Sequence, residues 1–408
     1  MMQQDKKLSL LSIPVVVAAL GYFVDIYDLL LFSIVRIKSL KSLGLSDEMI
    51  SDQGMDIIGH QMFGLLIGGI IWGVMGDKKG RLSVLFGSIL LYSLANIANG
   101  FVQTAEQYSL CRFIAGIGLA GELGAGITLV SELIPKEKRG VATSLVAGIG
   151  LTGAVAAYFI AQVFDWRVCY FIGGGLGLSL LFLRVSVFES GMFKHIRHAN
   201  IAKGNFLMFF TDWKRFRKYF LSILIGLPTW YAIGILVSFS REFAQKMGIE
   251  GEVDPGKAIM FAYVAISIGD VVIGLVSQKL RSRKKALYIF YAITTLAIIL
   301  YFMQEGGTAN GMYAVCALLG FGTGFWAIFV TMAAEHFGTN LRATAATTVP
   351  NMVRGSLPLI ALLYRSLATV QGELAAAATT GGIVMIITLL AAHFTEETFG
   401  KDLDFLEQ

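Results

Sequence analysis

Long runs of apolar residues alternate with short polar segments along the whole chain of 408 residues. Each run is about 20 residues or longer, which is the length that an α-helix needs to cross a hydrocarbon layer of about 30 Å. The pattern predicts an all-α membrane protein with twelve transmembrane helices and no separate soluble domain. The predicted spans are residues 8–36, 54–76, 83–103, 105–134, 140–163, 168–187, 218–240, 256–278, 285–303, 309–337, 342–367 and 372–395.

The composition agrees with a chain embedded in the lipid bilayer, because 55% of the residues are hydrophobic and only 15% are charged. Most of the 33 lysines and arginines fall in the tails and loops on one side of the predicted spans, which is the side of both termini. Cytoplasmic loops carry such an excess, so we expect both termini in the cytoplasm. The net charge of +5 therefore reflects topology, and a nucleic-acid partner is not expected.

The longest polar stretch, residues 188–217, divides the chain near its middle. We interpret it as a cytoplasmic linker that contains a short surface helix at residues 213–218. It would join an N-terminal half of six helices, residues 1–187, to a C-terminal half with a short tail, residues 218–408.

Two segments of the first half recur in the second half at nearly the same offset, 203 residues in one case and 201 in the other. Such a repeat indicates duplicated halves that face each other, with a solute site between them near the middle of the membrane. The matches pair Glu132 and Arg139 with Glu335 and Arg342, and residues 73–82 with residues 274–283.

A charged loop with spaced glycines, Gly-Val-Met-Gly-Asp-Lys-Lys-Gly-Arg at residues 73–81, joins the second and third predicted spans. Basic residues in such a loop can simply set the orientation of a hairpin. The loop also resembles the signature loop of the major facilitator superfamily. The resemblance implies the major facilitator fold, in which this loop forms an ionic latch that holds one gate conformation. The predicted gating residues are Gly73, Asp77, Lys78, Gly80, Arg81, Glu132, Arg139, Asp270, Glu335 and Arg342.

The fourth predicted span contains the sequence Arg112-Phe-Ile-Ala-Gly-Ile-Gly-Leu-Ala-Gly-Glu122, with glycines spaced between two charged residues. It resembles the metabolite:proton symporter family of the same superfamily, whose members carry proline, betaine, citrate, ketoglutarate and shikimate. The first helix departs from that family, which favours Glu-Trp-Phe-Asp where this chain has Asp25-Ile-Tyr-Asp28. Aromatic-acid and sugar porters also place acids in this helix, so the substrate class stays open.

Two aspartates in the first span, Asp25 and Asp28, are three residues apart and share one helix face. A charge at this depth costs at least about 2.5–3.5 kcal/mol, so such residues face a partner or a wet cavity. Burial and mutual repulsion disfavour two negative charges there, so we interpret the pair as the proton carrier. Arg112 lies level with Asp28 at 1.5 Å per residue and is its expected partner. The alternatives are an ion pair that does not titrate and an Arg112 that extends to the membrane surface.

A second group of charged and aromatic residues lies near the middle of the membrane by the same measure. Glu122 comes from the first half of the chain and Arg354 from the second. A guanidinium and aromatic walls are expected of a pocket for a small carboxylate or zwitterion. The alternatives are packing roles for the aromatic residues and a structural Glu122–Arg354 ion pair. The predicted substrate-binding residues are Glu122, Trp230, Tyr231, Trp326, Asn351 and Arg354.

These features predict a secondary active transporter that works by alternating access, with protons and a small molecule as its partners. An enzyme is not expected, because the sequence shows no nucleophile with a base and no set of metal ligands at membrane depth, and no cofactor is expected. A sugar porter or uniporter, and a proton-coupled efflux pump for a cationic compound, remain alternatives. We expect a monomer in a bacterial inner membrane.

Overall fold

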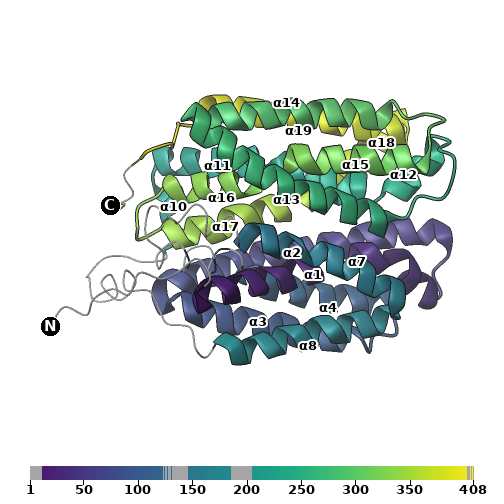
Figure 1. Ribbon diagram of the computed structural model, residues 1–408, viewed down its shortest axis with the longest axis horizontal. Coiled ribbons are helices and arrows are strands. Elements are labelled where there is room, and N and C mark those ends of the chain that lie inside the picture. The colour runs from purple at the N-terminus through teal and green to yellow at the C-terminus, as the bar shows by residue number, and fades with distance from the viewer. Residues whose placement is uncertain are drawn as a thin grey trace.

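In the computed structural model the two halves of the chain form two bundles of helices that lie side by side (Figure 1). The N-terminal bundle is drawn in purple to teal, and the C-terminal bundle runs from teal through green to yellow. The structure describes residues 12–122, 124, 126, 130, 146–184, 205–401, 405 and 407.

The helices of the N-terminal bundle run along the long axis of the molecule (Figure 1). Several extend beyond the predicted apolar spans. The first, for example, continues past residue 36 to Ser42. The described helices are α1 (Ile13–Ser42), α2 (Asp47–Lys79), α3 (Arg81–Asn99), α4 (Ala105–Leu119), α7 (Gly153–Val163) and α8 (Trp166–Arg184).

The C-terminal bundle starts earlier than predicted. Residues 213–218 are not a separate surface helix but the beginning of α11, whose first turn is capped by the Asp212 side chain accepting from the Arg215 N–H. The helices are α10 (Met208–Thr211), α11 (Trp213–Tyr231), the π-helical η1 (Ala232–Val237), α12 (Ser240–Lys246), α13 (Pro255–Leu280), α14 (Arg283–Phe302), α15 (Ala309–Thr323), α16 (Trp326–Glu335), α17 (Arg342–Gly355), α18 (Leu357–Gln371) and α19 (Glu373–Phe394).

Ten helical segments within the described ranges are long and apolar enough to cross a membrane. The fourth predicted span is described only in part, and the eleventh is divided at Ser356 into α17 and α18. Large apolar side chains face outwards, such as Phe182 at 80% and Val370 at 85% exposure, whereas Arg112 and Arg354 are buried. This distribution, apolar outside and charged inside, fits a protein whose surrounding solvent is lipid.

Glycines let the helices of the N-terminal bundle approach closely. A Cβ atom added to Gly64 of α2 would lie 2.2 Å from the carbonyl oxygen of Phe113 in α4, and one added to Gly116 of α4 would lie 2.2 Å from that of Gln61. Real Cβ atoms do not approach backbone atoms so closely, so small residues are required here.

The two halves change direction at corresponding positions. The turn between α2 and α3 has Gly80 at φ 102°, and the turn between α13 and α14 has Arg281 at φ 49°; both residues have a positive φ, and they are 201 residues apart, which is the offset of the predicted repeat. The fourth and tenth predicted spans are also interrupted, at residues 120–121 after α4 and at residues 324–325 between α15 and α16. These matches support duplicated halves.

We call one end of the bundle the tail face and the other the far face. The tail face carries Gly80, residues 336–341 and residues 395–401, and the far face carries residues 43–46, 100–104 and 303–308. Among the described helices, the halves meet where α2 packs against α17 and where α13 packs against α1 and α7.

Candidate functional site

The predicted pairing of the first and fourth helices is confirmed. Arg112 Nη1 lies 2.9 Å from Asp28 Oδ1, and both side chains are fully buried. Arg112 also donates to Asn96 Oδ1 at 3.0 Å and to Gln61 Oε1 at 3.3 Å. The guanidinium lies 5.3 Å from the centre of the Tyr170 ring. The ion pair therefore sits wholly inside the N-terminal bundle, and Arg112 does not extend to the membrane surface.

Asp25 has a different environment, although it lies only one turn from Asp28. It is fully buried and acts electrostatically on the hydroxyl groups of Tyr22 in α1 and Tyr263 in α13. Arg354 of α17 acts on the same two hydroxyl groups. The two acids therefore have different surroundings. Asp28 pairs with Arg112 inside the N-terminal bundle, whereas Asp25 lies near tyrosines of both halves.

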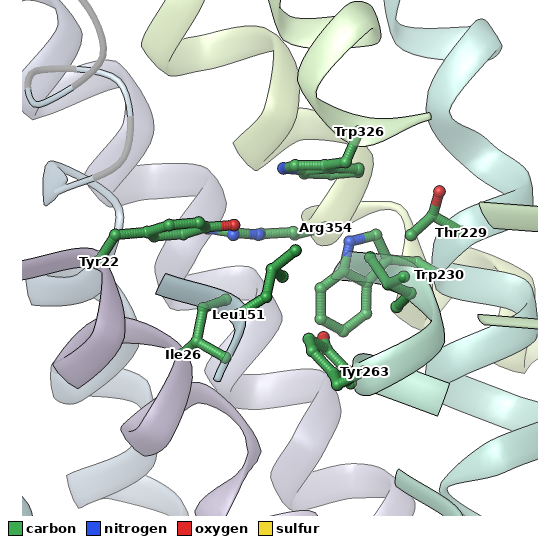
Figure 2. Close-up of a pocket in the computed structure, with 9 residues that line it drawn as sticks. Tyr22, Ile26, Leu151, Thr229, Trp230, Tyr263, Trp326 and Arg354 are labelled. Carbon is green, nitrogen blue, oxygen red and sulfur yellow. The ribbon is translucent and has the colours of Figure 1, made fainter. Parts of the chain in front are cut away.

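A small cavity of about 20 Å³ lies at that boundary (Figure 2). It has room for about one water molecule, so the protein's own side chains fill the site in this conformation. Both halves contribute to its walls. The lining residues are Tyr22, Ile26 and Leu151 from the N-terminal half, and Thr229, Trp230, Tyr263, Ile266, Trp326 and Arg354 from the C-terminal half.

The walls of the cavity carry hydrogen-bond donors that have no acceptor. Nε of Arg354 and the indole nitrogens of Trp230 and Trp326 are buried and make no hydrogen bond, and neither does Oγ1 of Thr229. Guanidinium and indole N–H groups can only donate. An unpaired buried donor costs about 1–3 kcal/mol, so this cluster is poised to bind an acceptor.

Arg354 is held in place by Asn351 and an aromatic ring. Its Nη1 donates to Asn351 Oδ1 at 3.3 Å, and its guanidinium lies 5.6 Å from the centre of the Trp326 ring. Asn351 in turn donates to the carbonyl oxygen of Ala120, the residue that follows α4, at 2.8 Å, which links the two halves. Among the described residues no carboxylate lies within ion-pair distance of Arg354. The structure therefore does not bring Arg354 and Glu122 together as an ion pair, although Glu122 is buried.

Tyr231 does not belong to the predicted pocket. Its hydroxyl donates to the carbonyl oxygen of Ala377 in α19 at 2.6 Å, and its ring packs against Gly381. The physical reason is helical geometry, because neighbouring residues point about 100° apart. Trp230 faces the cavity, so Tyr231 faces the interior of the C-terminal bundle.

Asp77 joins the halves at the tail face through a contact with the start of α17. Its Oδ2 accepts from the backbone N–H of Thr344 at 2.9 Å and from the Thr344 hydroxyl at 2.5 Å. Thr344 lies in the first turn of α17, where N–H groups lack acceptors within the helix. The carboxylate thus caps α17 from the other half, which also places a negative charge at the positive end of the helix dipole.

Other residues of the loop at 73–81 contact α17, form the turn or face outwards. Gly73 contacts α17, because an added Cβ would lie 3.2 Å from Thr348 Cγ2, and its carbonyl accepts from the Thr344 hydroxyl. Gly80 has a positive φ that favours glycine, and Lys78 is exposed. The Arg81 side chain and the predicted gating residues Glu132 and Arg139 lie outside the described residues.

The C-terminal half has its own ion pair at the tail face. Glu335 at the end of α16 accepts from Arg283 at the start of α14, with Nη2 and Oε1 2.9 Å apart. Arg342 is the first residue of α17. Asp270 lies deeper, where its Oδ1 accepts from the Ala327 N–H at the start of α16.

The structure shows a contact between the halves at the far face that was not predicted from the sequence. Arg36 Nη2 in α1 lies 2.6 Å from Glu242 Oε1 in α12, and it also donates to the carbonyl oxygen of Ser238. The guanidinium stacks 4.3 Å from the centre of the Phe239 ring, and the Arg36 side chain is fully buried. The predicted first span ended at residue 36, so Arg36 looked like a loop residue. Contacts therefore cross between the halves on both sides of the cavity.

Two helical bundles with a contracted cavity between them, and buried charges on both sides, define a membrane transporter of the two-half type. A sequence profile of the Major Facilitator Superfamily matches residues 18–362. The chain therefore belongs to this superfamily, and it is a transporter and not an enzyme.

The relatives of this chain are transporters of metabolites. It is 28% identical to the niacin transporter NiaP of Acinetobacter baylyi, covering 81% of each chain, and 26% identical to the gentisate transporter of Corynebacterium glutamicum, covering 84% of this chain and 79% of the relative. The solved proton:xylose symporter XylE superposes with a TM-score of 0.74 over 96% of this chain and 97% of its own. At 17% identity, this last likeness shows the fold alone.

Proposed function

We propose that this transporter carries a small carboxylate with a flat apolar body, such as an aromatic monocarboxylate, together with protons. The observation that carries the proposal is the cluster of buried donors without acceptors around the cavity, formed by Arg354, Trp230 and Trp326.

A carboxylate matches this cluster in charge and in hydrogen bonding. It offers only acceptors, whereas the guanidinium and the indoles offer only donors. The guanidinium fork can also bind both carboxylate oxygens at once. A cationic substrate would leave the same donors unpaired and would face the positive charge of Arg354. A neutral sugar could accept from the donors but would leave that charge without a counterion.

The other walls favour a flat apolar body. Tyr22 and Tyr263 add rings to those of Trp230 and Trp326, and Ile26, Leu151 and Ile266 complete an apolar lining. Aromatic rings pack well in offset or edge-to-face contacts with such walls. Niacin and gentisate, which the relatives named above carry, are both aromatic monocarboxylates, and this agrees with the proposal.

The two acids of α1 would couple transport to protons in different ways. Protonation of Asp28 would break its ion pair with Arg112 and loosen the N-terminal bundle. The charges of Asp25 and Arg354 both act on the hydroxyls of Tyr22 and Tyr263, so the two charged groups lie in one region, and a substrate carboxylate on Arg354 would bring a second negative charge towards Asp25. Binding of the substrate is therefore favoured when Asp25 carries a proton. Both effects favour joint movement of proton and carboxylate.

Alternating access would come from opening one set of contacts at a time. Asp77 with Thr344 closes the tail face, and Arg36 with Glu242 closes the far face. The contracted cavity between them would correspond to an intermediate state that is closed on both sides, between the two open forms. We propose that the tail face is cytoplasmic, that the membrane is a bacterial inner membrane, and that the protein works as a monomer.

Uptake into proteoliposomes tests the proposal. With an imposed pH gradient, radiolabelled nicotinate or benzoate should accumulate, whereas nicotinamide and benzamide, which have the same rings without the charge, should not. Xylose serves as the sugar control. Accumulation of the amides or of xylose in preference to the acids would refute the carboxylate assignment. Uptake of the acids at the same level with and without the pH gradient would refute proton coupling.

A further inference from the structure

The tenth helix is interrupted beside the cavity. It ends as α15 at Thr323 and resumes as α16 at Trp326, with Gly324 at ψ 45° and Phe325 at φ −110° outside helical geometry. Trp326 is thus the first residue of the second segment. Its ring lies across Arg354 at the edge of the cavity (Figure 2). The geometry of the interruption therefore decides where this ring lies.

An interruption of this kind leaves the first N–H groups of the new helix without acceptors. Phe325, which stands at the N-cap position, has no side chain that can accept. The acceptor comes instead from the neighbouring helix α13, because Asp270 Oδ1 accepts from the Ala327 N–H at 2.9 Å. Asp270 is 5% exposed. A carboxylate at this end of a helix is also favoured by the helix dipole.

Two glycines bring the carboxylate within reach. A Cβ atom added to Gly324 would lie 2.7 Å from Gly269 Cα and 2.8 Å from the carbonyl oxygen of Ile266. A Cβ atom added to Gly269 would lie 2.6 Å from the carbonyl oxygen of Phe321. The backbones of α13 and of the interruption therefore touch at the residue next to Asp270.

We propose that Asp270 is a positioning residue of the substrate site: by capping α16 from α13, it fixes the interruption of the tenth helix and places the indole of Trp326 over Arg354. The inference rests on the proposed substrate site, because Trp326 and Arg354 are two of its walls. It gives Asp270 a role distinct from the gating role predicted from the sequence.

The test compares two substitutions of Asp270. Asp270→Asn keeps an acceptor oxygen in nearly the same place, whereas Asp270→Ala removes it. The matched control is Asp254→Ala, because Asp254 caps the first turn of the same helix by accepting from the Gly256 N–H at 2.8 Å, away from the cavity. All three purified proteins are first shown to be folded and monodisperse.

The first measurement needs no substrate. The emission of Trp326 is obtained by subtracting the spectrum of a Trp326→Phe partner from each protein, and its quenching by acrylamide is recorded. Trp326 is 7% exposed, so it should be shielded in the wild type, in Asp270→Asn and in Asp254→Ala. In Asp270→Ala the quenching constant should rise at least about twofold, as expected when an N-cap is lost.

The second measurement is transport of the acid identified in the uptake experiment. Asp270→Ala should raise KM about fivefold with kcat nearly unchanged, which is the effect of losing a typical N-cap, whereas Asp270→Asn should stay near the wild type. Unchanged shielding of Trp326 in Asp270→Ala, or an equal loss of shielding in Asp254→Ala, would overturn the inference. Because the shielding of Trp326 is measured without substrate, it tests the role of Asp270 even if the proposed substrate is wrong.

Discussion

Replacing Arg36 by glutamine should open the far face. The wild-type side chain is fully buried, lies 2.6 Å from Glu242 and stacks on Phe239. A hydrogen bond to a charged group contributes about 1.5–3 kcal/mol and a cation–π contact about 0.5–1 kcal/mol. Glu242 is 21% exposed, so water offsets part of its loss. We therefore expect the contracted state to lose about 2–3 kcal/mol.

That loss is large enough to change the population of states. Since 1.4 kcal/mol is a factor of ten, about 2 kcal/mol shifts the equilibrium about thirtyfold. A protein that is about nine-tenths contracted would then be only about one-quarter contracted. Spin labels at Gln103 and Gln371, both exposed on the far face, would report the change as a longer distance in pulsed electron resonance. The labels require replacement of the three native cysteines.

A second ion pair provides the matched control. Arg365 of α18 pairs with Asp56 of α2 at 2.8 Å, also between the halves at the far face, but the two side chains are 38% and 46% exposed. Exposed pairs contribute about 0–1 kcal/mol, so Arg365→Gln should leave the distances nearly unchanged. An unchanged distribution in folded Arg36→Gln, or an equal change in Arg365→Gln, would refute the proposed far-face latch.

Three further predictions concern coupling, the tail face and stability. Asp28→Asn should abolish accumulation driven by a pH gradient while substrate exchange continues, and full gradient-driven uptake would remove Asp28 from the coupling mechanism. Asp77→Asn should lengthen distances across the tail face without abolishing binding, because it weakens the cap on α17, and unaltered spin-label distances would count against this latch. Glu397 is partly buried, which raises its pKa, but the Ser282 hydroxyl and backbone N–H groups that it accepts from outweigh this and lower the pKa below the usual value. Its contribution to stability is therefore present at neutral pH and lost as the pH falls through the lowered pKa, so Glu397→Gln should melt at a lower temperature at pH 7 and lose less on acidification, and an unchanged melting curve would contradict this.

The membrane spans and the Asp28–Arg112 pair could be predicted from the sequence because both follow from helix length. Apolar runs reveal spans, and a rise of 1.5 Å per residue puts acid and base at the same depth. The same reasoning could not find Arg36 and Glu242. Their pairing depends on α1 continuing to Ser42, beyond its apolar part, and on how the two halves meet, because Arg36 and Glu242 are 206 residues apart in the sequence.

Other contacts were hidden for different reasons. Asp77 contacts the first turn of α17, and backbone N–H groups at a helix start do not show as charges in a sequence. Tyr22 and Tyr263 look like ordinary aromatic residues of apolar spans, and only the packing of the halves brings them to the cavity. Tyr231 was chosen by depth alone, and depth says nothing about which way a helix face points.

The most direct test of the central claim is a titration of the purified protein with an acid and its amide. Isothermal calorimetry with nicotinate and nicotinamide should show the acid binding at least about tenfold more tightly, a difference of about 1.4 kcal/mol. Arg354→Lys keeps the charge but loses the planar fork, so it should weaken acid binding at least about tenfold, and Arg354→Gln should abolish the preference for the acid. Equal affinity for acid and amide in the wild type, or acid binding that neither substitution weakens, would contradict a carboxylate site at Arg354.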